Sequence, residues 1–183
     1  NGTGRFSLDT TDGPARMDLD AALRGGELLL GPLYAKLPDH PVQLGLRASA
    51  QGGAFEVSRL RLNDADALQL DGALAFDAKG ELKTLKLDRL HASFPAAYQR
   101  YGQAWLSTLG LRDMRIAGQL NGSLDLRTDG PHSFAFTTDG LNVADAAGRL
   151  AIEDLHGGLD WAIQGDRPAT TLGWRNLQFY RVP

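Results

Sequence analysis

The sequence predicts a mainly β protein built on a long antiparallel meander sheet, and three observations support this fold class. Apolar and polar residues alternate with period two through almost all of the 183 residues, as in strands with one apolar face. Turn signals such as Lys79-Gly80 separate the alternating runs. Phase slips after Val57 and after Leu87 indicate β-bulges, which increase the twist of a sheet. We therefore expect a strongly twisted sheet that curls into a groove or half-barrel.

The clearest strand prediction is the segment 114–127, where apolar residues alternate with mostly polar ones. The same alternation predicts strands at 17–23, 42–48, 68–76 and 159–163. Antiparallel hairpins are expected to join such strands, because residues that tolerate positive φ stand between them. These turn signals are Asp12-Gly13, Lys79-Gly80, Asp129-Gly130, Asp139-Gly140 and Gly165-Asp166.

One helix is predicted over 96–109, where apolar or aromatic residues recur at helical spacing after Pro95, and Gly110 can end it. Two roles are open for this helix: a plug that caps the edge or mouth of the β-structure, and a movable gate. The proline-rich stretch 32–41 is predicted to be a loop with one short helical turn over 33–37. The residues of the helix stripe are Tyr98, Tyr101, Trp105 and Leu109.

Composition and charge exclude several classes of protein. The chain has 19 Lys and Arg against 22 Asp and Glu, with both signs spread along it, so it has no basic field for nucleic acid. It has no cysteine, which removes thiolate and zinc-thiolate chemistry. No apolar run approaches the ~20 residues of a membrane-spanning helix. We expect residues 1–183 to form a single domain and, because both ends lie within strand pattern, to be a fragment of a longer protein.

The sequence carries no recognisable catalytic or metal-binding motif, so we expect neither an enzyme nor a cofactor. Nucleophile elbows, phosphate-binding glycine loops and paired-histidine zinc motifs do not occur in it. The acidic stretches 9–13 and 63–66 lack the glutamate that closes a calcium loop, and we interpret both as solvated hairpin tips. A glycoside hydrolase with paired carboxylates is a remaining alternative. The histidines, which lack metal-ligand spacing, are His40, His91, His132 and His156.

The predicted apolar face is larger than one helix can cover, since on the order of ten to thirteen strands are expected. The sheet must therefore curl around itself, pack as two layers, or leave apolar surface for a ligand. Apolar and aromatic residues at alternating positions suit either a shared core or a groove wall that contacts acyl chains. The candidate groove residues are Leu70, Leu74, Phe76, Leu120, Leu124, Leu126, Phe134, Phe136, Trp161, Ile163 and Trp174.

The cadence of the segment 68–74, LQLDGAL, resembles the AsmA/TamB-like superfamily of bacterial envelope proteins, including its YdbH-like branch. Segments 141–145 and 148–155 have the same character, and the resemblance extends over 15–179. It implies a taco-like protein with a repeating β-groove, located in the periplasm and anchored to the inner membrane by a segment outside this chain. Such a protein conducts phospholipid toward the outer membrane and takes part in outer-membrane biogenesis.

On this resemblance the expected partners are phospholipid acyl chains, the remainder of the same polypeptide, and inner- and outer-membrane proteins. Acyl chains would lie on the apolar face while head groups stay in water. The alternative is a structural or adhesive β-meander module, as in autotransporter passengers, with a packed interior and no ligand. Aromatic residues that line an open groove favour the first function, and aromatic residues buried in a closed core favour the second.

Overall fold

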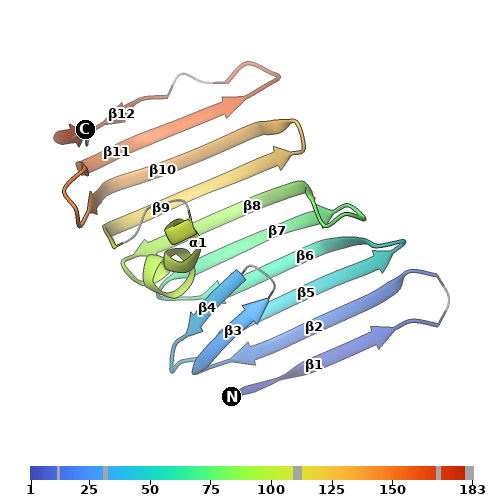
Figure 1. The fold of residues 1–183 in the computed structure, drawn as a ribbon. Coiled ribbons are helices and arrows are strands. Elements are labelled where there is room, and N and C mark those ends of the chain that lie inside the picture. Colours follow the sequence, from blue (N-terminus) through green and yellow to red (C-terminus); the bar gives the residue numbers. More distant parts are fainter. Residues whose placement is uncertain (12, 31–32, 109–112, 168–169, 180–183) are drawn as a thin grey trace.

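The computed structural model describes the chain except for residues 12, 31–32, 109–112, 168–169 and 180–183 (Figure 1). Side chains at 28–30, 33–34, 104–105 and 108 also lie outside the description. A helical segment over 96–108 consists of a π-helical turn, η1 (Tyr98–Gly102), and a short α-helix, α1 (Gln103–Thr108). The strands are β1 (Gly2–Asp9), β2 (Ala15–Leu23), β3 (Gly26–Leu30), β4 (Leu33–Leu37), β5 (Val42–Gln51), β6 (Ala54–Asp64), β7 (Leu68–Phe76), β8 (Leu82–Phe94), β9 (Met114–Arg127), β10 (Gly130–Asp145), β11 (Leu150–Ala162), β12 (Leu172–Gly173) and β13 (Asn176–Phe179).

Eleven of the described strands form one long antiparallel meander sheet, as the alternation predicts. Its order is β1-β2-β5-β6-β7-β8-β9-β10-β11-β12, and β13 pairs with β11 beside β12. The sheet is open, because β1 and β12 lie at opposite ends and it does not close into a barrel (Figure 1). The remaining strands, β3 and β4, form a separate two-stranded hairpin. The predicted helix is confirmed within the described residues, and its last expected residue, Leu109, lies outside them.

The predicted bulges are confirmed by shifts in the strand register. The pairing of β6 with β7 slips between Val57 and Leu60, and the pairing of β8 with its neighbour β9 slips between Leu87 and Leu90. An extra residue in one strand of a pair increases local twist, so these shifts contribute to the twist of the sheet.

Two local predictions are wrong. Segment 33–37 is the strand β4 rather than a helical turn, since pairing with Gly26–Leu30 satisfies its backbone and the prolines of this stretch flank the strand without interrupting it. Asp139-Gly140 is not a hairpin tip but lies inside β10, where the register slips between Thr138 and Asn142. Gly140 has a φ of 74° there, because a bulge can require positive φ as a turn does.

The register gives the sheet one apolar and one polar face. Residues directly opposite each other on antiparallel strands project to the same face, so a row of partners can be followed across the sheet. One such row crosses nine strands and is apolar throughout, with a glycine at its centre. It consists of Phe6, Leu19, Leu46, Leu60, Gly72, Leu87, Leu124, Phe134 and Trp161.

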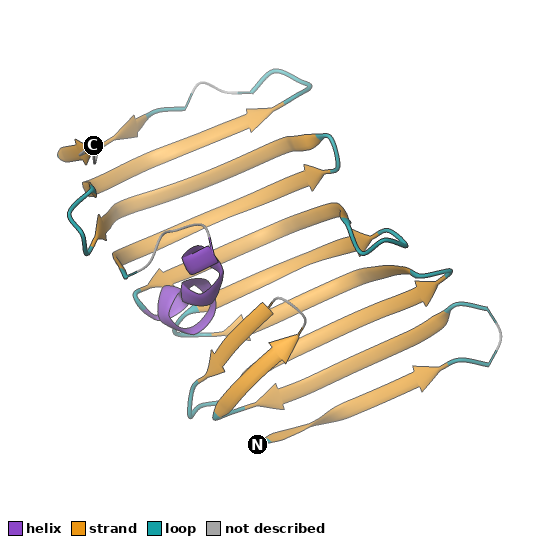
Figure 2. Cartoon of the chain, viewed as in Figure 1, coloured by secondary structure: helices purple, strands orange, loops and turns teal. Residues whose placement is uncertain are grey.

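The β3–β4 hairpin and the helical segment 96–108 lie over one face of the sheet, near the end where β6 stops and β7 begins (Figures 1 and 2). We call these two elements, with the short connection 38–41, the cover. They lie on the apolar face, because Asp64 shares a cross-strand row with Leu68 there and bonds to η1. Many of the buried side chains belong to the cover or to the strand ends near it: Val42, Leu44, Asp64, Ala67, Ala92, Ala97, Tyr98 and Met114. Others, such as Ala48, Val57 and Leu141, are buried elsewhere on the sheet.

Candidate functional site

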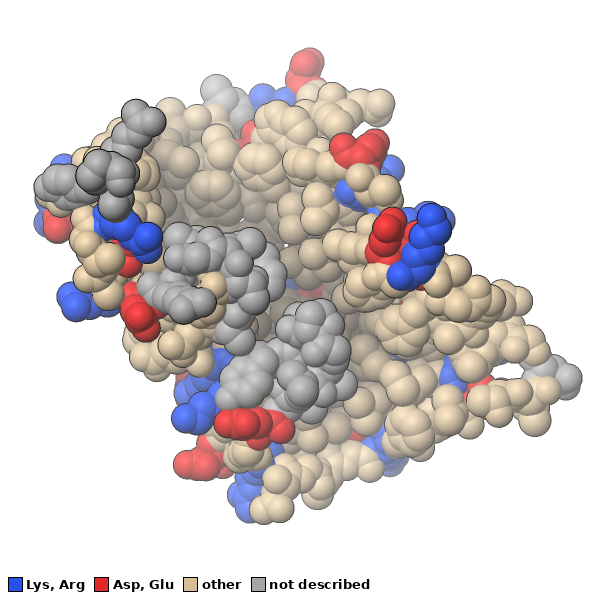
Figure 3. Space-filling model, in the orientation of Figure 1, with Lys and Arg blue, Asp and Glu red and all other residues tan. Residues whose placement is uncertain are grey.

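The apolar face beyond the cover is the largest candidate site, and we call it the open face. It consists of the apolar-face rows that cross β7 at Leu70, Gly72, Leu74 and Phe76. Most of its side chains are only half buried, although Ala48 and Val57 are fully buried. Figure 3 views the molecule from this side and shows uncharged residues over most of it, with charged side chains mainly at the margins. The large apolar side chains here that stay more than a third exposed are Phe6 at 63%, Leu8 at 60%, Phe55 at 37%, Leu82 at 38% and Trp161 at 38%.

The structure places most of the predicted groove residues together on this face. Leu124, Phe134 and Trp161 share one row. Leu74 and Leu126 share the next row through Leu85.

The remaining predicted groove residues occupy the neighbouring rows or lie beyond the paired strands. Leu70 and Phe136 share a row through Leu90 and Gly122. Phe76 lies between Phe55 and Leu82, and Leu120 belongs to the row at the cover, beside Ala92. Ile163 follows β11 and Trp174 follows β12, at 55% and 51% exposed, and the strand register does not extend to either.

Two aromatic rings stack on the open face. The ring centroids of Phe134 and Trp161 lie 5.5 Å apart with an interplanar angle of 25°, a stacked arrangement. Phe134 lies on β10 and Trp161 lies opposite it on the adjacent strand β11, and both project to the open face. They form a partly exposed aromatic surface rather than part of a closed core.

The opposite face carries ion pairs between neighbouring strands. Arg61 on β6 donates to Asp71 on β7 at 2.8 Å, and Arg89 on β8 donates to the other carboxylate oxygen of Asp71. The hydrogen bond from Arg61, with help from Arg89, holds the pKa of Asp71 below its usual range. Arg127 likewise lowers the pKa of Asp125. Because Asp71 and Asp125 stay ionised, the polar face is suited to contact with water rather than with apolar groups.

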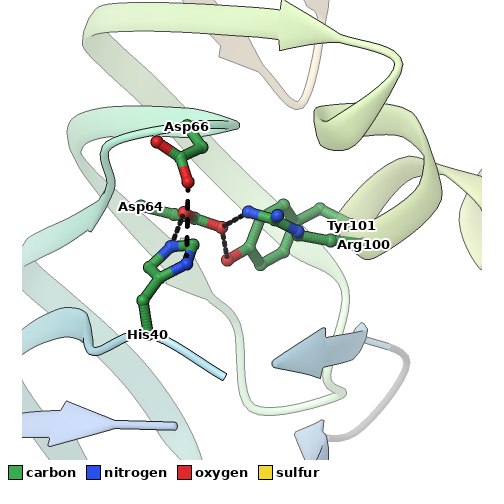
Figure 4. Close-up of polar contacts among 5 residues, drawn as sticks. All are labelled: His40, Asp64, Asp66, Arg100 and Tyr101. Carbon is green, nitrogen blue, oxygen red and sulfur yellow. Dashed lines mark hydrogen bonds and ion pairs between the residues drawn. The ribbon is translucent and has the colours of Figure 1, made fainter. Parts of the chain in front are cut away.

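Asp64 is the centre of a buried polar cluster beneath the cover (Figure 4). Its side chain is 0% exposed, and three donors surround it. His40 Nε2 lies 2.7 Å from Oδ1, while Arg100 Nη1 at 2.7 Å and the Tyr101 hydroxyl at 2.8 Å both donate to Oδ2. Asp66 is 69% exposed and lies 3.6 Å from the other ring nitrogen of His40. The cluster therefore joins the end of β6 to η1 and to the connection between β4 and β5.

The surroundings of Asp64 stabilise its charged form. Burial alone raises the pKa of a carboxyl group, but the hydrogen bonds from His40, Arg100 and Tyr101 outweigh burial and leave the pKa of Asp64 lowered. Burial, with the hydrogen bond to Asp64, raises the pKa of the Tyr101 hydroxyl. Asp64 is therefore an ionised carboxylate at neutral pH with all its described donors in place.

This cluster corrects the prediction that 63–66 is a solvated hairpin tip. Asp66 matches that prediction, whereas Asp64 is buried because the cover folds over this end of β6. One signal in the sequence could have found it: Asp64 continues the apolar phase of Leu60 and Leu62, where alternation places an apolar residue. The partners of Asp64 lie 24 to 37 residues away along the chain, and nothing local connects them to it.

Two residues of the predicted helix stripe, Tyr98 and Tyr101, make different contacts. Tyr98 is buried, and its hydroxyl accepts the backbone N–H of Met114 at 3.1 Å, which ties η1 to the start of β9. Tyr101 reaches Asp64. The side chain of Trp105 and all of Leu109 lie outside the described residues.

A cavity of about 740 Å³ lies between η1 and the ends of β9, β10 and β11. Its lining is mixed, with apolar residues such as Met114 and Ile116 beside charged residues such as Arg115, Glu153 and Arg175. The last two form an ion pair at 3.5 Å. The cover thus packs directly around Asp64 but leaves space above the neighbouring strands.

Within the described residues, no three His, Asp or Glu side chains come close enough to hold a metal ion. In the same part of the chain, no helix has the length and apolar character of a membrane-crossing segment. Comparison with known proteins finds no matching family model, curated protein or solved structure.

Proposed function

We propose that this chain is a lipid-binding segment of a periplasmic envelope protein that transfers phospholipid, with acyl chains held on the open face. One observation carries the proposal: a cross-strand apolar row runs over nine strands of an unclosed sheet and keeps aromatic and aliphatic side chains partly exposed. Soluble monomers rarely expose a contiguous apolar surface of this kind without a partner for it. The resemblance of segment 68–74 to AsmA/TamB-like proteins supports the envelope location and the anchoring segment outside this chain.

The open face suits lipid tails because it offers apolar area without a closed pocket. Each methylene group that leaves water for such a surface contributes about 0.8 kcal/mol. The opposite face is charged, so tails bind on one side and head groups stay in water. We further propose that the twisted sheet forms the wall of a groove, to which the bulges at Val57 and Leu87 contribute. Movement of lipid along this wall requires no catalytic residue.

The sheet edge supports the proposed pairing with further strands of the same polypeptide. All eight residues of β1 are exposed, and its outer backbone groups have no strand partner among the described residues. An exposed edge of this kind is a template for another strand. Further strands added there would lengthen the apolar row beyond Phe6.

The proposal is tested by native mass spectrometry of the chain purified from a bacterial host without detergent. We expect adducts with the masses of phospholipids. A double variant that places charge on the open face, Phe55→Lys with Leu82→Lys, is expected to lower the lipid-bound fraction. Both side chains are more than a third exposed and share a row with Phe76, so the cost to folding is small.

The matched control adds the same two charges on the polar face, with Gln43→Lys and Ser123→Lys. Both positions are exposed and lie opposite residues of that face, so lipid binding should stay at the parental level. A parent chain that is free of lipid after gentle purification, and that takes up none from added phospholipid vesicles, would contradict the proposal. That result would favour the structural or adhesive module.

A further inference from the structure

We propose that Asp64 is the positioning residue that holds the cover over one end of the apolar face and thereby limits how far an acyl chain extends along the strands. This inference rests on the proposed function and adds a chain-length limit to it.

The position of Asp64 makes it the anchor of the cover. It is the last residue of β6, on the same cross-strand row as Leu68, and its side chain is fully buried. One carboxylate oxygen accepts a hydrogen bond from His40, which lies in the connection between β4 and β5. The other oxygen accepts hydrogen bonds from Arg100 and Tyr101 of η1 (Figure 4). A single carboxylate therefore fastens both parts of the cover to the large sheet.

Among the described side chains, Asp64 supplies three of the hydrogen bonds between the cover and the large sheet. Among the described elements, η1 and α1 contact β4 and each other more extensively than they contact any strand of the large sheet. The hydrogen bond from the backbone of Met114 to Tyr98 is one further tie. Loss of the carboxylate would leave Arg100 partly buried without its ion-pair partner, which favours displacement of η1 toward water.

The open face is somewhat longer than one leaflet's layer of acyl chains, so it has room for a chain in extended form. From the row of Leu70 to the row of Phe76, the strands run about 20 Å. One leaflet of a bilayer holds its chains within about 15 Å, half of the hydrocarbon thickness. Beyond Phe76 the turn carries Asp77, Lys79 and Glu81, where a head group can remain in water. A lipid would therefore lie with its head group at the turns and its chain ends against the cover.

The cavity beside η1 is a less favourable place for the end of an apolar chain than the open face. Arg115, Glu153 and Arg175 line it together with the apolar residues. A methyl end placed there would displace water from charged groups, which is unfavourable. The limit set by the cover therefore applies to the strands that the cover overlies (Figure 1).

The test compares which lipids the parent chain and Asp64→Asn extract from vesicles of equimolar phosphatidylglycerols with myristoyl, palmitoyl, stearoyl or arachidoyl chains. Native mass spectrometry gives the bound species. We expect the parent to prefer the shorter chains and Asp64→Asn to bind relatively more stearoyl and arachidoyl lipid, by up to about tenfold, because the added methylenes gain a surface to bind. Amide hydrogen exchange in 96–108 should become faster in the same variant.

Two controls carry the same substitution. Asp66→Asn alters an exposed carboxylate beside the cluster, and Asp71→Asn removes a carboxylate with two arginine partners on the polar face. Both should keep the parental lipid profile. If Asp64→Asn does not fold, Tyr101→Phe removes one of the three hydrogen bonds to Asp64 and should move the profile in the same direction.

An unchanged lipid profile in an Asp64→Asn protein whose helical segment exchanges faster would overturn the chain-length limit and leave lipid binding intact. Unchanged exchange in 96–108 would overturn the positioning role whether or not lipid binds. If neither the parent nor any variant binds lipid, the proposed function itself fails.

Discussion

A single carboxylate at an apolar-face position shows how this chain tolerates a buried charge. Asp64 has no access to water, yet its two oxygens meet three donors, so the cost of burial is offset by charge-assisted hydrogen bonds. Removing such a partner leaves the remaining charges uncompensated. We expect Asp64→Asn to reduce the free energy of unfolding by about 3 kcal/mol, toward the lower end for buried pairs because Arg100 and His40 are partly exposed.

The stability of the protein should also depend on pH through Asp64. Its pKa is lowered in the folded state, so its contribution is fully present above the unfolded value of about 3.9 and is lost as pH falls through the folded pKa. Urea unfolding at a series of acidic pH values measures this loss. Other carboxylates also titrate there, so the difference between the parent and Asp64→Asn isolates the contribution of Asp64. A constant difference across that range would contradict the assigned pKa direction.

Gly157 is a second residue whose identity the structure requires. Its φ is 101°, and a Cβ there would lie 2.1 Å from the carbonyl oxygen of Thr171. We expect Gly157→Ala to weaken the pairing of β11 with β12 and to lower the free energy of unfolding by about 3 kcal/mol. The control is Gly148→Ala, with a φ of 71° and open space at the Cβ, which should cost about 1 kcal/mol. Urea midpoints of the two variants test this, and equal midpoints would disprove the close approach.

At the scale of elements, alternation predicts each long strand because every second side chain meets the same environment. The segment 114–127 is the strand β9 in full, and the phase slips after Val57 and Leu87 correspond to shifts in register. The short elements were harder to predict. The strand β4 is stabilised by pairing with β3, and Gly140 lies in a bulge of β10 rather than in a turn. In both cases the conformation depends on pairing with a neighbouring strand, which the local sequence does not specify.

Adjacent positions on β9 test the assignment of the two faces. Leu124 lies in the apolar row between Leu87 and Phe134, while Ser123 lies opposite Ala135 on the polar face. We expect Leu124→Asp to unfold the domain or abolish lipid uptake, since a charge would replace a half-buried apolar side chain. Ser123→Asp should change the free energy of unfolding by no more than about 0.5 kcal/mol. Circular dichroism and lipid binding measure both, and an unaffected Leu124→Asp protein would mean that the faces are exchanged.

At the scale of the whole molecule, the large sheet is open and one-sided. The cover shields one end of the apolar face, and the rest stays partly exposed. The polar face carries several ion pairs, for example between Arg47 Nε and Asp18 Oδ1 at 2.7 Å. The molecule therefore presents one broad, partly exposed apolar surface.

Metal ions should not affect the stability of the whole molecule. The described residues contain no group of three His, Asp or Glu side chains that could hold a metal ion, and the buried carboxylate of Asp64 is already bonded to His40, Arg100 and Tyr101. We expect calcium and EDTA to leave the melting temperature unchanged. An upward shift of several degrees with calcium would reveal a site among the acidic turns, because a ligand that binds the folded state raises its stability.

The sequence by itself determined the mainly β antiparallel meander, strands such as 68–76 and 114–127, the main bulges and the sharing of one face by Leu70, Leu74, Leu124 and their neighbours. Each follows from a local pattern, since alternation with period two assigns every residue of a strand to a face. Only the tertiary structure decided that the sheet stays open, that the cover lies over one end of it, and that Asp64 is buried there. These features depend on contacts between residues far apart in the chain, such as Asp64 with Tyr101, for which a local pattern contains no information.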